Sequence, residues 1–72
     1  MIKEYIITLT RNIGIGKDIV NYFEKRGCEV VFKDAETFPK TIIISTMNHI
    51  EDIRRMEYVG DVIEARQSRL IV

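Results

Sequence analysis

The sequence predicts an α+β fold, in which two helices cover one face of a four-stranded antiparallel sheet. Three observations support this prediction. Segments with two-residue hydrophobic alternation and segments with helical spacing follow one another in the order β-α-β-β-α-β. A polar stretch around the single Pro separates the second and third predicted strands along the chain and is typical of a hairpin loop. A chain of 72 residues allows one domain, so both helices must share one sheet.

The first half of the chain begins with residues 2–10, which are rich in β-branched and aromatic types and predict a strand. Residues 11–16 contain two glycines and interrupt it. Residues 17–26 have helical spacing, with one apolar stripe formed by Ile15, Ile19, Val20 and Phe23. Gly27 follows a Lys-Arg pair, which is the expected end of a helix.

The second half begins with a predicted strand over 28–33, a loop over 34–40 and a strand over 41–46 that is apolar on both faces. Such a strand is expected at the centre of a sheet. Asn48 and Glu51 resemble a capping box, and the following helix has the apolar stripe Ile50, Ile53 and Met56. Residues 61–66 predict the last strand.

Each β-α-β half requires a crossover connection, and such crossovers are right-handed almost without exception. Two interleaved right-handed units joined by the central hairpin give the ferredoxin-like sandwich. We therefore expect one ferredoxin-like domain over residues 1–66 and a C-terminal tail over residues 67–72.

Alternation along the strands assigns the side chains to two faces. The residues expected to face the helices are Tyr5, Ile7, Leu9, Val30, Phe32, Ile42, Ile44, Ile63 and Ala65. The open face is expected to carry Ile6, Val31, Ile43 and Val62, with a rim of Thr8, Thr10, Lys33, Ser45, Glu64 and Arg66. An apolar centre with a polar rim is typical of a partner-binding surface. The predicted surface is Ile6, Val31, Ile43, Val62 and Glu64.

The composition argues against several classes of partner. Eleven basic and 11 acidic side chains give a net charge of zero, which does not favour nucleic acid or an acidic membrane surface. The longest apolar runs are far shorter than a membrane span of roughly 20 residues. One Cys cannot form an internal disulfide, which fits a reducing compartment, and a cytoplasmic location is expected.

The sequence offers little catalytic chemistry. His49 is the only His, and no pattern places it beside Cys28, which is expected to be a small buried hydrophobe. One Cys and one His without ligand spacing do not predict a metal site. The turn Gly14–Gly16 precedes a helix, where N–H groups can hold an anion, but it lacks the P-loop pattern, and its glycines are expected chiefly to ease the turn from strand to helix. We expect neither an enzyme nor a cofactor.

The second half of the chain also resembles a known family. A strand ending in Thr46, a short helix, the segment Gly60-Asp61-Val62-Ile63-Glu64-Ala65 and a tail ending in Leu70-Ile71-Val72 are similar to the propeptide-type inhibitors of subtilisin-like serine proteases. The segment Tyr5-Ile6-Ile7-Thr8-Leu9 resembles the opening strand of that family. The resemblance implies that the open sheet face docks on the protease. It also implies that Arg69, Leu70, Ile71 and Val72 occupy the substrate cleft, with Val72 at the primary subsite.

The sequence therefore predicts a non-enzymatic domain that binds a protein, most specifically a subtilisin-like protease. Two alternatives stay open. One is a small assembly or adaptor module that pairs through its sheet face or an edge strand, including with a second copy of itself. The other is a small-ligand regulatory domain that uses the Gly14–Gly16 turn.

Overall fold

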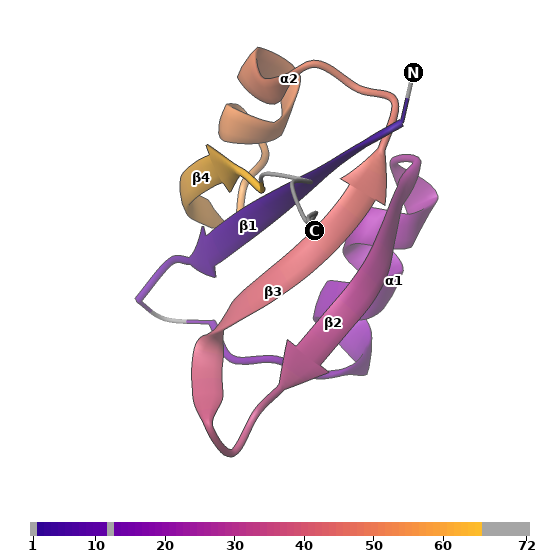
Figure 1. Cartoon of the computed structure of the whole chain (residues 1–72). Coiled ribbons are helices and arrows are strands. Elements are labelled where there is room, and N and C mark those ends of the chain that lie inside the picture. The colour runs from indigo at the N-terminus through magenta and orange to yellow at the C-terminus, as the bar shows by residue number, and fades with distance from the viewer. Residues whose placement is uncertain (1, 12, 66–72) are drawn as a thin grey trace, which may run out of the picture.

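The computed structural model describes residues 2–11 and 13–65. The elements are β1 (Lys3–Leu9), α1 (Lys17–Lys25), β2 (Cys28–Asp34), β3 (Phe38–Thr46), α2 (Ile50–Arg54) and β4 (Val59–Glu64). The strands form one antiparallel sheet in the order β2-β3-β1-β4, and both helices lie behind it in Figure 1. This is the ferredoxin-like α+β sandwich, so the predicted fold class is confirmed.

The core lies between the sheet and the two helices. Ile7 pairs with Ile42 on one side and with Val62 on the other, which sets a buried row across β3, β1 and β4. Helix α1 covers this layer with Ile19 and Phe23, as its apolar spacing predicts, and α2 adds Ile53. We call this side of the sheet the helix-covered face and the other side the open face.

Tyr22 attaches α1 to the segment between α2 and β4. Its hydroxyl accepts a hydrogen bond from the Glu57 N–H at 2.8 Å, and its ring packs edge-on against Tyr58 with centroids 4.8 Å apart. The Arg26 guanidinium lies 3.7 Å from the centre of the Tyr22 ring. These contacts hold the helix layer together at the surface.

Thr46 joins two turns at the end of β3. Its hydroxyl donates to the Gly27 carbonyl at 2.8 Å and accepts from the Asn48 N–H at 3.1 Å. Gly27 has φ of 81°, so the predicted end of α1 at a glycine is confirmed. The predicted capping box is wrong, because α2 begins after His49 and the Asn48 amide donates instead to the Arg26 carbonyl at 2.9 Å.

The β2–β3 hairpin is tighter than the sequence predicts. Strand β3 begins at Phe38 and not at residue 41, which leaves a turn of residues 35–37. The Asp34 carboxylate closes this turn by accepting hydrogen bonds from the N–H groups of Glu36 and Thr37, each at 3.2 Å. The hydrogen bond from the Thr37 backbone is the main reason why the pKa of Asp34 lies below its ordinary value.

Candidate protein-binding surface

An apolar stripe crosses the open face over all four strands. Ile6 of β1 pairs with Ile43 of β3 and with Ile63 of β4, and Ile43 in turn pairs with Phe32 of β2. Residues directly opposite in an antiparallel ladder point to the same face. We call this set, together with Val31, the open-face stripe: Ile6, Val31, Phe32, Ile43 and Ile63.

The β2 end of the stripe is widened by a β-bulge. The register shifts between Val30 and Phe32, so two residues of β2, Val31 and Phe32, lie opposite Ile43 alone. Both side chains are exposed, Val31 at 46% and Phe32 at 40%. The Phe32 ring contacts the exposed ring of Phe38 with centroids 6.3 Å apart, which extends the apolar area toward the hairpin.

The sequence prediction for β4 is wrong at Val62 and Glu64. Val62 pairs with Ile7 and is 3% exposed, so it lies in the core, whereas Ile63 is 57% exposed on the open face. Glu64 pairs with Tyr5 on the helix-covered side, where its carboxylate lies 3.7 Å from the Lys3 ammonium. The strand contains two adjacent aliphatic residues, Val62 and Ile63, so alternation is compatible with either face assignment, and the prediction chose the wrong one.

The prediction for β2 is wrong at Phe32 and Lys33 for a different reason. The extra residue of the bulge reverses the alternation after Val31, so Phe32 turns to the open face. Lys33 pairs with Ile42 and turns to the helix side. Ile6, Val31 and Ile43 are on the open face as predicted, whereas Phe32 and Ile63 are the two stripe residues that sequence reasoning missed.

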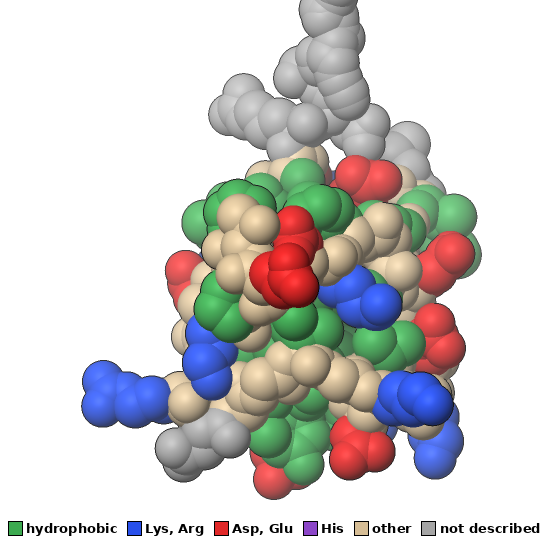
Figure 2. All heavy atoms as spheres, turned by 90° about the horizontal axis from the view of Figure 1, so that it is seen from below, with side chains coloured by type: hydrophobic (Ala, Val, Ile, Leu, Met, Phe, Trp, Pro, Cys, Tyr) green, Lys and Arg blue, Asp and Glu red, His purple; other side chains and the backbone are tan. Residues whose placement is uncertain are grey.

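Carboxylates flank the stripe. Glu4 and Glu29 both pair with Ser45 in the next row on one side, and Asp61 pairs with Thr8 on the other. Within residues 2–11 and 13–65, no Lys or Arg occupies an open-face position of the ladder. The open face thus combines an apolar centre with an acidic rim. Figure 2 shows the molecule from below, where basic and acidic side chains are interspersed.

Cys28 and His49 are the two other candidate residues that the sequence offered. Cys28 is buried as predicted, and its thiol lies 3.6 Å from the Thr46 hydroxyl, while His49 is exposed at the start of α2. In the part of the chain that the structure describes, no three His, Cys, Asp or Glu side chains gather as a metal site. The predicted tail contacts Arg69, Leu70, Ile71 and Val72, and the rim residue Arg66, lie outside the described residues.

No protein-family model, curated protein or solved structure matches the chain. None of the helices described here is both long and apolar enough to cross a bilayer.

Proposed function

We propose that the chain is a non-enzymatic protein-binding domain whose open-face stripe docks on a partner, and that this partner is a subtilisin-like serine protease which the domain inhibits. The observation that carries the proposal is the continuity of the stripe from Phe32 through Ile43 and Ile6 to Ile63. Isolated surface aliphatics are common, but a row across an entire sheet is typical of an interface centre.

The rim specifies the chemistry of the partner surface. Glu4, Glu29 and Asp61 favour a partner with basic residues around an apolar area. Their carboxylates also act against a face-to-face pair of two copies. The described open face offers them no basic residue, so carboxylates meet carboxylates or neutral side chains in such a pair.

Strand β4 connects the stripe to the tail. It is an edge strand, and the Ala65 N–H still donates to the Glu4 carbonyl at 2.8 Å, so pairing with β1 continues to the last residue that the structure describes. In the proposed complex the stripe docks first and Arg69–Val72 lie in the substrate cleft, where an extended segment gains main-chain hydrogen bonds. A docked domain raises the local concentration of its own tail at the cleft.

Titration of subtilisin activity tests this proposal. The unchanged chain is expected to inhibit competitively, and a variant that lacks Arg69–Val72 is expected to lose inhibition. Ile63→Asp is expected to weaken inhibition at least about tenfold because it places a charge in the stripe. Met47→Asp is the control, since Met47 is another exposed apolar side chain that is not part of the stripe, at 70% exposure against 57% for Ile63.

Two results contradict the proposal in different ways. Absence of inhibition at tens of micromolar overturns the assignment of the protease. Inhibition that is unchanged by Ile63→Asp overturns the role of the stripe. Light scattering at the same concentrations gives the mass of the free chain, and a dimer mass that Ile63→Asp abolishes supports the assembly alternative instead.

A further inference from the structure

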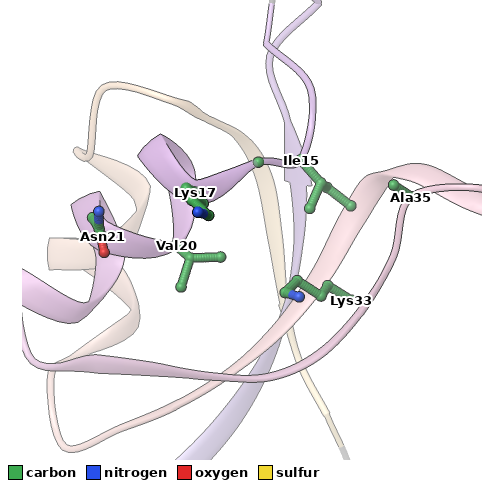
Figure 3. Close-up of a pocket in the computed structure, with 7 residues that line it drawn as sticks. Ile15, Lys17, Val20, Asn21, Lys33 and Ala35 are labelled. Atoms are coloured by element: carbon green, nitrogen blue, oxygen red, sulfur yellow. The ribbon is translucent and has the colours of Figure 1, made fainter.

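A second surface feature lies on the helix side of the sheet, away from the open-face stripe. It is a pocket of about 470 Å³ between the start of α1 and the end of β2. Six side chains that line it are shown in Figure 3: Ile15, Lys17, Val20, Asn21, Lys33 and Ala35. This volume falls within the range of small-molecule sites in proteins, roughly 300–1,000 Å³.

The β2 bulge is what places a cation in this pocket. Without the extra residue at Val31, regular alternation puts Lys33 on the open face, as the sequence predicted. The bulge reverses this and sets Lys33 opposite Ile42, on the side of α1. Lys17 and Asn21 are one helical turn apart on α1 and border the same pocket, as Figure 3 shows.

The charge of the pocket is of one sign. Two ammonium groups, from Lys17 and Lys33, border it, and no Asp or Glu is among its lining residues. Asp34 follows Lys33 in sequence, but its carboxylate accepts from the N–H groups of the hairpin turn. Within the described residues, the ion pair at the surface is that of Lys3 with Glu64, so neither pocket lysine is neutralised by a carboxylate there.

The rest of the lining is aliphatic. Ile15, Val20 and Ala35 supply apolar walls, and the methylene stems of the two lysines add to them. Figure 3 shows Val20 extending from α1 toward Ile15 and Lys33, with the Asn21 amide on the next part of the helix. A ligand that matches this lining has an anionic head and a short apolar body.

We propose that this pocket binds a small aliphatic carboxylate, whose head group contacts Lys17 and Lys33 and whose hydrocarbon chain packs on Ile15 and Val20. Charge-assisted hydrogen bonds to ammonium groups fix the head, and removal of the chain from water adds affinity with each methylene. The site is independent of the protein-binding function, because none of its residues belongs to the open-face stripe.

The test is an amide-resolved NMR titration of the full chain with hexanoate, acetate, hexanol and inorganic phosphate as separate probes. Hexanoate is expected to shift the signals of Val20 and Lys33 saturably, and to bind more tightly than the other three. The double variant Lys17→Gln/Lys33→Gln is expected to lose about tenfold or more of the hexanoate affinity. Lys25→Gln is the control, since Lys25 lies on the same helix outside the pocket.

Each other outcome overturns the proposal. Equal binding of hexanol shows that the lysines do not select a head group, and equal binding of phosphate shows that the apolar walls do not contribute. Unchanged hexanoate affinity in the double variant contradicts the role of the two lysines, and the absence of any saturable shift shows that hexanoate does not bind. Both lysines are exposed, so the double variant is expected to remain folded. The dispersion of its amide signals checks this directly.

Discussion

The two faces of the sheet are made from neighbouring aliphatic residues, yet these residues lie in opposite environments. Ile7, Ile42 and Val62 lie in the core beneath the helices. Their chain neighbours Ile6, Ile43 and Ile63 form the corresponding row on the open face. The difference between the rows is the helix layer, which covers one and leaves the other in contact with water. An aliphatic pair in a strand thus supplies one residue to the core and one to the uncovered face of the sheet.

The largest expected effect is at the β4 pair, where the structure and the alternation-based prediction disagree. Val62→Asp places a carboxylate in the core and is expected to cost more than about 4 kcal/mol. A domain of this size has roughly 4–11 kcal/mol of stability, so the variant is expected to be largely unfolded. Ile63→Asp is expected to cost no more than about 1 kcal/mol, because its side chain is already solvated.

Urea unfolding followed by circular dichroism measures both variants. A greater loss for Ile63→Asp than for Val62→Asp would mean that β4 pairs in the opposite register, with Val62 on the open face.

A milder pair tests the same comparison in the central strand. Ile42→Ala removes a fully buried side chain and is expected to cost about 2–5 kcal/mol through lost burial and an internal cavity. Ile43→Ala is expected to cost about 1 kcal/mol, chiefly through lower strand propensity. Equal losses in free energy of unfolding for the two variants would contradict the assignment of a covered and an open face.

The attachment of the helix layer gives a smaller effect. Tyr22→Phe removes the hydroxyl that accepts from the Glu57 N–H but keeps the ring contacts with Tyr58. The expected cost is about 1 kcal/mol, and amide exchange at Glu57 is expected to accelerate in the variant. Unchanged exchange at Glu57 would show that this hydrogen bond does not hold the layer in solution.

The smallest expected effect is the pH dependence of the hairpin beside the stripe. Hydrogen bonds from the Thr37 and Glu36 N–H groups lower the pKa of Asp34 in the folded chain, so the ionised form stabilises the fold. The stabilisation by the Asp34 carboxylate is complete above the ordinary carboxyl pKa of 3.8. It is lost as the pH falls through the lower pKa that Asp34 has in the folded chain. The stability difference between the unchanged chain and Asp34→Asn is therefore expected to shrink below that pH.

Thermal unfolding at a series of pH values measures this difference. Glu36→Gln is the control, because the backbone of Glu36, and not its carboxylate, takes part in the turn. A stability difference for Asp34→Asn that stays constant on acidification contradicts the proposed role of its carboxylate.

The sequence predicted the order of elements and the fold class because strands and helices here have clear hydrophobic periods. The apolar stripe of α1 and the glycine at its end were likewise readable from local residues. The faces of β2 and β4 were not. The bulge at Val31 is defined by pairing with β3, and the Val62–Ile63 pair satisfies either register. Both depend on contacts between distant segments, so the composition of the candidate surface was predicted only in part.

The most direct test of the protein-binding account is an amide NMR footprint of the labelled domain with catalytically inactive subtilisin. The account predicts that signals of the open-face stripe, above all Ile6, Ile43 and Ile63, shift or broaden on addition of the protease. Signals of α1 and α2 are expected to change little. A footprint confined to the helices, or a spectrum unchanged by excess protease, contradicts the account.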